Sequence, residues 1–435
     1  MLFRNARLAD GRVRDVRVEG ETIAAVGEGL DADGEVIEAD GRLLLPGMID
    51  AHVHFREPGF SHKETWATGS RSAAAGGVTT VVDQPNTDPP TVDGASFDRK
   101  ADLAAASLVD YGINGGVTAE WAPEELFERP MAALGEVFLA DSTGEMGIDV
   151  DRFETAVERA AMADVTVTVH AEDATLFDDD ALPAGDGPTG RAADADAWSA
   201  YRTAEAELAA VERAGEVARR HDADVHVAHT STPEGADAAA DAGMTCEATP
   251  HHLFLSRANL AELGTYGRMN PPLRSESRRA TLFERLVDGT IDVVATDHAP
   301  HTRAEKDAAL PAAPSGVPGV ETALPLLLEA ARTGELSYER VRDVTAADVA
   351  EVFDLPWKGR IEPGRDADLV LVDETDPEPI RGEKLHSRCG WTPFEGRRGV
   401  FPDLTAVRGT IVYRDGEFAD AQGRNVRTSA ADGGH

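Results

Sequence analysis

Short apolar runs rich in Val alternate with longer, Ala-rich stretches through the middle of the chain. The runs have the length and composition of buried strands, and the stretches 204–220, 233–242 and 275–287 have those of helices. Eight strand–helix units over about 300 residues are typical of a TIM (β/α)8 barrel, an α/β fold. The predicted strands are one that ends before His54, followed by 78–84, 111–117, 136–141, 165–170, 224–230, 245–251 and 292–298.

Both ends of the chain have a different pattern, in which short stretches with partial apolar alternation are separated by glycines. Such stretches occur before residue 45 and return at 368–373 and 410–416. Neither end is long enough to bury a core alone. We therefore expect one small β-sandwich domain built from 1–45 and 353–425, around a barrel over 46–352, with a tail over 426–435.

The charge of the chain is strongly acidic and limits the possible partners. The net charge is −37, and the 42 basic residues include only five lysines. Carboxylates are spread along the whole chain, which argues against nucleic acid or an acidic membrane surface as a partner, because phosphate binding needs a basic patch. We interpret the charge as adaptation to a salty cytoplasm, where repulsion is screened, with an unusually acidic mesophilic protein as the alternative.

The remaining composition points to a cytoplasmic protein with a real core. Hydrophobic residues make up 42% of the 435 residues. No run of 18 apolar residues indicates a transmembrane helix, and the first residues lack an apolar signal region. The two cysteines, Cys246 and Cys389, do not make a disulfide framework, which fits a reducing compartment.

Polar residues gather where the predicted barrel strands end, which is where barrel enzymes carry their chemistry. His52 and His54 are two positions apart at the end of the first strand, so their side chains share one face with Arg56. Any one such histidine could be a hydrogen-bonded structural residue, but the whole set at one mouth favours a metal site. The others are Asp83, Gln84, Asn86, Asp141, His170, His229, His251, His252, Asp297 and His298.

These residues suffice for two cations. His52, His54 and Asp297 can hold one ion, and His170 and His229 can hold a second, with a bridging anion between them. Such ions lower the pKa of a bound water, and Asp297 can accept its proton. Two such cations, a bound water and a carboxylate base can together hydrolyse, or form, an amide bond in a ring.

The motifs that contain these residues resemble the dihydroorotases of the cyclic amidohydrolase superfamily, over about residues 47–416. That resemblance implies reversible cyclisation of N-carbamoyl-L-aspartate to L-dihydroorotate in de novo pyrimidine (UMP) biosynthesis, with two zinc ions at the mouth of a TIM barrel. The matching segments are 50–59, 85–87, 170–173, 226–232, 249–253, 270–274, 297–301, 314–322 and 359–369.

The resemblance also implies which residues bind the small-molecule substrate. Arg56, Asn86 and His301 would grip its carboxylate, since a planar guanidinium fork and neutral donors suit that group. The other implied contacts are His54 and, for the ring amides, Asn270 with the 314–319 loop, including Ser315 and Gly316.

The fourth strand departs from the family pattern. Many relatives place a carbamylated lysine there as the bridging ligand, but 135–144 contains no lysine. Glu136 aligns with it, whereas Asp141 lies about 16 Å further along an ideal strand, near the expected mouth. We favour Asp141 as the bridge, as in some bacterial relatives, with Glu136 second because 136, 138 and 140 share a face. A mononuclear site without a strand-4 ligand is the third possibility.

Two other functions remain open from the sequence. One is another cyclic amidohydrolase, such as an allantoinase, and the other is an inactive dihydroorotase-like scaffold. A homo-oligomer is possible, His251 and His252 are expected to be structural, and the 385–396 segment could pack on the barrel or on a partner.

Overall fold

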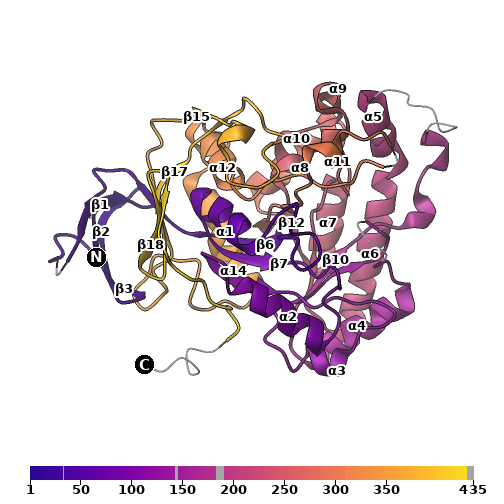
Figure 1. Cartoon of the computed structure of the whole chain (residues 1–435), viewed down its shortest axis with the longest axis horizontal. Helices are drawn as coiled ribbons and strands as arrows, with labels where there is room; N and C mark the ends of the chain where they lie inside the picture. Colours follow the sequence, from indigo (N-terminus) through magenta and orange to yellow (C-terminus); the bar gives the residue numbers. More distant parts are fainter. Residues whose placement is uncertain (33, 143–145, 183–190, 311, 429–435) are drawn as a thin grey trace.

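Eight parallel strands form a closed barrel in the computed structural model, which describes residues 1–32, 34–142, 146–182, 191–310 and 312–428 (Figure 1). Two sheets, β6-β7-β8 and β9-β10-β11-β12-β13, are joined by parallel bridges between Gly115 and Leu134 and between Val53 and His298. The predicted barrel is therefore confirmed. Its strands are β6 (Met48–Val53), β7 (Val78–Asp83), β8 (Asp110–Ile113), β9 (Leu134–Phe138), β10 (Val167–His170), β11 (Val225–Val227), β12 (Thr245–Ala248) and β13 (Val293–Val294).

Helices follow each barrel strand and lie around it (Figure 1). The three helices expected at 204–220, 233–242 and 275–287 are present as α6, α7 and α10, and Thr203, Thr232 and Ser275 cap their first turns with side-chain oxygens. The eight are α1 (Trp66–Ala75), α2 (Gly94–Ala104), α3 (Pro123–Leu126), α4 (Val150–Met162), α6 (Ala204–His221), α7 (Pro233–Ala242), α10 (Glu276–Asp288) and α12 (Ala323–Arg332). Shorter or additional helices are α5 (Arg191–Tyr201), α8 (Pro250–Phe254), α9 (Leu260–Leu263), α11 (Arg303–Lys306), α13 (Tyr338–Arg342) and α14 (Asp348–Val352).

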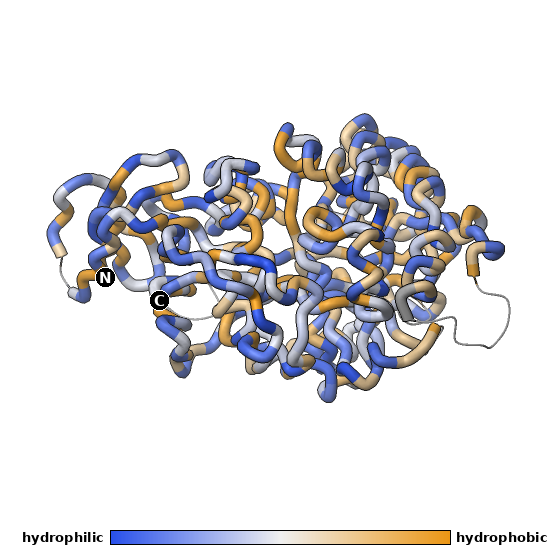
Figure 2. The backbone as a smooth tube through the Cα atoms, turned by 90° about the horizontal axis from the view of Figure 1, so that it is seen from above, coloured by the Kyte–Doolittle hydropathy of each residue, from blue (hydrophilic) through white to orange (hydrophobic). Residues whose placement is uncertain are grey.

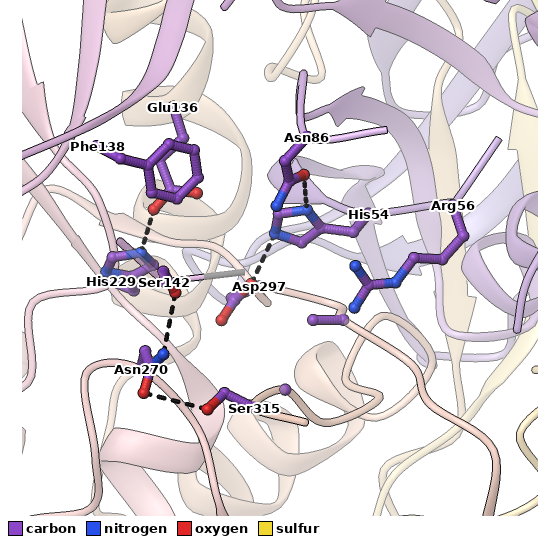
Figure 3. A pocket seen from close by; sticks show the side chains of 12 residues that line it. His54, Arg56, Asn86, Glu136, Phe138, Ser142, His229, Asn270, Asp297 and Ser315 are labelled. Atoms are coloured by element: carbon purple, nitrogen blue, oxygen red, sulfur yellow. Dashed lines mark hydrogen bonds and ion pairs between the residues drawn. The ribbon is translucent and has the colours of Figure 1, made fainter. Parts of the chain in front are cut away.

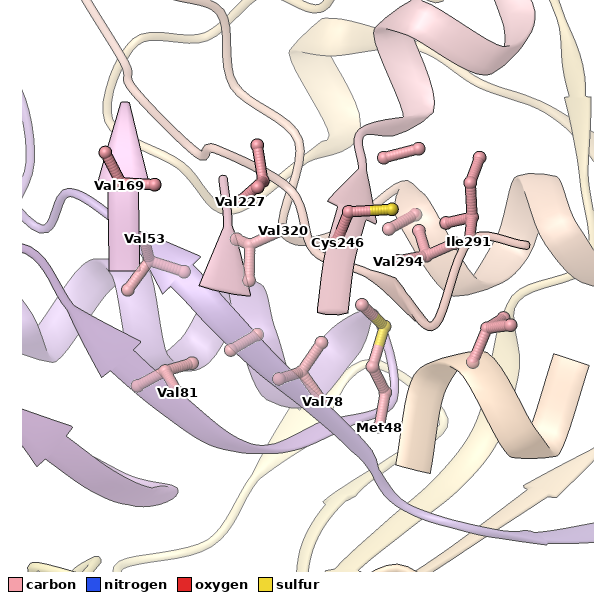
Figure 4. Packing of buried hydrophobic residues seen from close by; sticks show 14 of the residues in the cluster. Met48, Val53, Val78, Val81, Val169, Val227, Cys246, Ile291, Val294 and Val320 are labelled. Carbon is pink, nitrogen blue, oxygen red and sulfur yellow. The ribbon is translucent and has the colours of Figure 1, made fainter. Parts of the chain in front are cut away.

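Valines of the barrel strands pack with residues of the surrounding helices in a buried cluster between the two layers (Figure 4). Val53, Val81, Val169 and Val227 are each at most 1% exposed, as expected for β-branched residues on buried strands. Cys246 lies in the same cluster and is also buried. The core fixes the strand ends, and therefore the positions of the polar residues that follow them.

The two ends of the chain build one nine-stranded sheet, at the end of the molecule where indigo and yellow strands meet in Figure 1. β14 pairs antiparallel with β5 on one side and with β17 on the other, so the first and last segments share a ladder. The strands are β1 (Leu2–Arg7), β2 (Val13–Glu19), β3 (Thr22–Gly27), β4 (Val36–Glu38), β5 (Leu43–Pro46), β14 (Leu369–Val372), β17 (Pro402–Val407), β18 (Thr410–Arg414) and β19 (Glu417–Phe418). The pairing explains why neither end needs a core of its own.

A buried ammonium group joins the barrel to this sheet. Lys358 Nζ lies 2.8 Å from a carboxylate oxygen of Asp110 at the start of β8 and 2.7 Å from one of Asp368, which precedes β14. Asp366 is 3.2 Å away. Burial opposes the charge, but the three carboxylates outweigh burial and raise the pKa of Lys358, which stays a cation.

The segment over 385–396 packs on the barrel, which the sequence leaves open. Cys389, Trp391 and Phe394 share a buried cluster with Leu273 and Val317. A two-stranded ribbon, β15 (Glu378–Pro379) with β16 (Arg398–Gly399), flanks it. The expected tail is described only to Thr428, and residues 429–435 lie outside the described residues.

Hydrophilic residues are distributed over the length of the molecule rather than gathered at one end (Figure 2). Among the described residues, no helix has the combination of length and apolarity needed to span a bilayer.

Candidate active site

Six buried histidine and carboxylate side chains converge at the carboxyl ends of the barrel strands. They come from β6, β9 and β10, or lie one to three residues after β6, β11 and β13, although they are up to 245 residues apart in sequence. Each is at most 6% exposed. The six are His52, His54, Glu136, His170, His229 and Asp297.

The first group consists of His52, His54 and Asp297. His54 Nε2 lies 2.9 Å from Asp297 Oδ1, and His52 Nε2 lies 3.7 Å from the same oxygen. His52 Nε2 is buried, yet no hydrogen bond is formed with any described residue. A buried, unpartnered imidazole nitrogen beside a carboxylate fits a cation ligand.

The second group consists of His170 and His229. His170 Nδ1 and His229 Nε2 are 3.0 Å apart, and both face Glu136 Oε1, at 2.9 and 2.5 Å respectively. Each of the two ring nitrogens can donate a hydrogen to this carboxylate oxygen or, when it carries none, ligate a cation beside it.

Glu136 lies between the two groups. Its Oε1 faces His170 and His229, while its Oε2 lies 3.4 Å from His52 Nε2. Glu136 accordingly belongs to both candidate metal clusters, with His52 and His54 in one and with His170 and His229 in the other. A single carboxylate therefore lies within reach of both groups of histidines.

The position of Asp141 differs from the one that we favoured. It follows β9 by three residues, its side chain is exposed, and its Oδ1 accepts a hydrogen bond of 2.6 Å from the Gly147 amide. It belongs to neither candidate cluster of the described residues. The physical reason is that the chain leaves the strand direction after Phe138, so Asp141 turns away from the mouth while Glu136 keeps its inward parity.

The electrostatics of the site favour charged carboxylates. Burial alone would raise the pKa of Glu136, but His229 and His52 outweigh burial and hold that pKa well below its usual value. Burial likewise opposes the charge of His170, but Glu136 and Glu172 raise its pKa to about 9. A divalent cation can balance these carboxylates in place of the imidazole protons.

Buried carboxylates orient two of the histidines by contacting the ring nitrogen that faces away from the site. Glu247 Oε1 lies 2.7 Å from His52 Nδ1, and Glu172 Oε2 lies 2.7 Å from His170 Nε2. Arg202 in turn donates to both oxygens of Glu172. Each carboxylate fixes the tautomer that turns the opposite ring nitrogen toward the site, as outer partners of metal-binding histidines do.

A small, polar pocket opens beside the two groups (Figure 3). It brings together most of the substrate contacts expected from the sequence: His54, Arg56, Asn86, Asn270, Ser315 and Gly316. Glu136, His229 and Asp297 also line it, whereas His301 lies just behind Arg56. Asn86 Oδ1 contacts His54 Nδ1 at 2.7 Å, which orients that ring and leaves the Asn86 amide NH2 as a donor.

Several site residues have left-handed backbone conformations. The φ angles are +67° at Arg56, +35° at His229 and +44° at Asp297. Non-glycine residues rarely adopt such angles, and they cluster at functional sites. β11 and β13 end at Val227 and Val294, before His229 and Asp297, so these two left-handed residues lie in the segments that lead into the mouth.

Some residues of the site are missing from the sequence-based prediction. Phe138 and Ser142 line the pocket, and Glu172 and Glu247 hold metal-type histidines. The shared parity of residues 136 and 138 could have indicated Phe138, and a glutamate inside an apolar strand could have indicated Glu247.

His251 and His252 lie on α8 next to the site. His252 is structural, because its ring nitrogens contact Thr249 Oγ1 at 2.9 Å and the Pro271 carbonyl at 3.0 Å. Burial is the largest influence on His251 and lowers its pKa to about 4, so its ring is neutral at pH 7.

Comparison with known proteins identifies the family to which this chain belongs. The model of the amidohydrolase family matches residues 43–412. An L-hydantoinase (dihydropyrimidinase) from Arthrobacter aurescens superposes with a TM-score of 0.91 at 28% identity and covers 97% of each chain. The fold is that of an amidohydrolase enzyme.

Curated relatives indicate one particular group of enzymes within the amidohydrolase family. A dihydroorotase of Halobacterium salinarum is 68% identical over 98% of this chain and 99% of its own length. A dihydroorotase of Bacillus licheniformis is 36% identical over 93% of this chain and 95% of its own. The chain belongs to the amidohydrolase family and, within it, to the dihydroorotases. A halophilic relative also fits the salt adaptation that the charge predicts.

Proposed function

We propose that this enzyme interconverts N-carbamoyl-L-aspartate and L-dihydroorotate in pyrimidine biosynthesis. The observation that supports this best is the pocket itself, in which Arg56 and Asn86 line the wall beside a histidine–carboxylate cluster. A guanidinium that lines a pocket beside candidate metal ligands suits a substrate with a carboxylate. The 68% identity to a dihydroorotase supports the same assignment.

We further propose that two zinc ions complete the site, held by His52, His54 and Asp297 and by His170 and His229. Glu136, rather than Asp141, would bridge them, because its two oxygens face the two groups. When bound, the ions would supply Lewis acidity and lower the pKa of water.

The residues of the chain would do the rest of the chemistry. Asp297 would carry the proton between water and the ring nitrogen, since it faces both the pocket and His54. Arg56 and Asn86 would hold the substrate carboxylate, with His301 behind Arg56, and Asn270 with Ser315 and Gly316 would hold the ring amides. Asn270 supports this role because it already exchanges hydrogen bonds with Ser142 and Ser315 across the pocket.

The domain boundaries, the β-sandwich, the cytoplasmic location and the oligomeric state are also proposals. The domain boundaries at 45, 353 and 425 follow the sheet composed of both chain ends, and the cluster of Phe3, Val16, Leu44, Leu371 and Leu404 supports a sandwich. A cytoplasmic location fits the two free, buried cysteines. A homo-oligomer stays a prediction.

An ultraviolet assay of dihydroorotate consumption in molar salt with zinc tests the function, with allantoin and dihydrouracil as alternative substrates. We expect turnover of dihydroorotate alone. Arg56→Ala should lower kcat/KM about 100-fold or more, because a buried charge pair with the carboxylate is lost. Arg56→Lys, which keeps the charge but not the fork, should be intermediate. Unchanged turnover by Arg56→Ala would reject the carboxylate assignment, and turnover of allantoin alone would indicate a different amidohydrolase.

A further inference from the structure

A second cation, Lys63, lies behind the proposed carboxylate-binding corner. It is in the turn between Arg56 and α1, and its side chain is only 13% exposed. Its Nζ lies 3.1 Å from His301 Nδ1 and 3.2 Å from Glu305 Oε1. Lys63 does not line the pocket itself, but it contacts His301, which in turn lies against Arg56.

The contacts of His301 define which ring nitrogen carries the hydrogen. An ammonium group can only donate, so His301 Nδ1 must accept from Lys63. The hydrogen of the neutral ring is then on Nε2, which lies 2.8 Å from the Ser315 carbonyl oxygen and donates to it. Burial, followed by the charges of Arg56 and Lys63, keeps the pKa of His301 well below its usual value, so the ring is neutral.

This tautomer affects Arg56. Arg56 Nη2 lies 3.2 Å from His301 Nε2, which can accept no hydrogen bond while it carries a hydrogen. Arg56 Nε donates to the Pro300 carbonyl at 3.2 Å, which orients the group. The outer edge of the guanidinium therefore keeps its donors for a ligand.

We propose that Lys63 is a positioning residue that sets the tautomer of His301 and thereby keeps Arg56 free to bind the substrate carboxylate. With the opposite tautomer, His301 Nε2 would accept from Arg56 and face the Ser315 carbonyl with a lone pair. That change would occupy Arg56 and displace the 314–316 wall of the pocket. The inference depends on the proposed function only in naming dihydroorotate as the ligand.

Two substitutions at Lys63 distinguish the effect of its hydrogen bond to His301 from the effects of its size and its charge. Lys63→Met has no donor, whereas Lys63→Gln is neutral but still donates to His301 Nδ1. We expect Lys63→Met to raise KM for dihydroorotate about 10-fold or more, the range for a lost hydrogen bond to a charged group, with little change in kcat. Lys63→Gln should stay near wild type. Lys384→Met, at an exposed lysine, is the matched control.

Equal impairment of the Met and Gln variants would overturn the proposal, as would a normal KM in both. Zinc content and the thermal midpoint of each variant show whether the fold is retained.

A spectroscopic measurement tests the tautomer without turnover. In zinc-loaded protein labelled with 15N-histidine, the signal lost in His301→Gln should report an Nε2–H tautomer in wild type and an Nδ1–H tautomer in Lys63→Met. The same tautomer in both proteins would reject the inference. Failure of wild type to consume dihydroorotate would instead reject the proposed function, while the tautomer measurement would still stand.

Discussion

At the scale of single residues, Glu136 is the side chain on which the site depends. It contacts three of the four metal-type histidines through two oxygens. A glutamate inside the strand reaches both groups because the histidines approach it from neighbouring and opposite strands of a narrow barrel. This geometry does not need the longer carbamylated lysine that the family pattern predicts on the fourth strand.

Glu136→Gln and Asp141→Asn form a matched pair of substitutions. Glu136→Gln should reduce bound zinc and lower activity by more than about 100-fold, a loss that even outer partners of metal ligands can cause. Asp141→Asn should keep both within about 3-fold of wild type, because the Asp141 side chain is exposed and accepts only the Gly147 amide among the described residues. Elemental analysis of protein purified without chelator, combined with the dihydroorotate assay, decides the point. The reverse order of effects would restore Asp141 as the bridge.

At the scale of elements, the 385–396 segment supports the proposed carboxylate corner from outside the barrel. Trp391 Nε1 donates to the His301 carbonyl at 2.8 Å, and Ser387 Oγ donates to Glu64 Oε2 at 2.5 Å. Trp391 is 3% exposed and meets the Tyr266 ring edge-on. The segment thus connects the last part of the chain to the loop after β13.

Trp391→Ala should destabilise the fold by about 3–5 kcal/mol, because it leaves a cavity in the cluster and removes a hydrogen bond. Trp357→Ala is the control, since Trp357 is 65% exposed and its loss should change stability by about 0.5 kcal/mol or less. Urea unfolding in molar salt measures both. Equal effects would show that the segment does not contribute to stability in this way.

At the scale of the whole molecule, charge dominates. Even if each of the 42 basic residues paired with one of the 79 acidic residues, 37 carboxylates would keep no counter-charge. Arginine forms most of the surface ion pairs, whereas Lys100, Lys306 and Lys358 are enclosed. Lys306 Nζ, for example, donates to the carbonyls of Arg268, Pro314 and Gly316. A compact ammonium with three donors fits such places better than a planar guanidinium.

We therefore expect the thermal midpoint to fall by several degrees or more when KCl is reduced from about 1 M to about 0.1 M, because the screening length rises from about 3 to about 10 Å. Calorimetry at constant pH with saturating zinc measures this. A midpoint that is independent of salt would favour the mesophilic interpretation of the charge.

The sequence alone determined the barrel, the participation of both chain ends in one small domain and most of the pocket. Strand composition and the placement of polar residues at strand ends are local properties, so they are readable from sequence. The same is true of His52, His54, His170, His229 and Asp297, each of which ends a predicted strand or directly follows it. These residues could be predicted to form one site because the barrel brings the carboxyl ends of its strands together.

Only the tertiary structure decided the contacts that depend on where each strand stops. The chain leaves β9 after Phe138, which keeps Glu136 inside the site and Asp141 outside it, and the left-handed residues His229 and Asp297 line the same pocket. The same applies to Glu247 behind His52 and to Lys63 behind His301, which are 195 and 238 residues apart in sequence. Such pairings carry no sequence period, because they arise from the closure of the barrel rather than from local geometry.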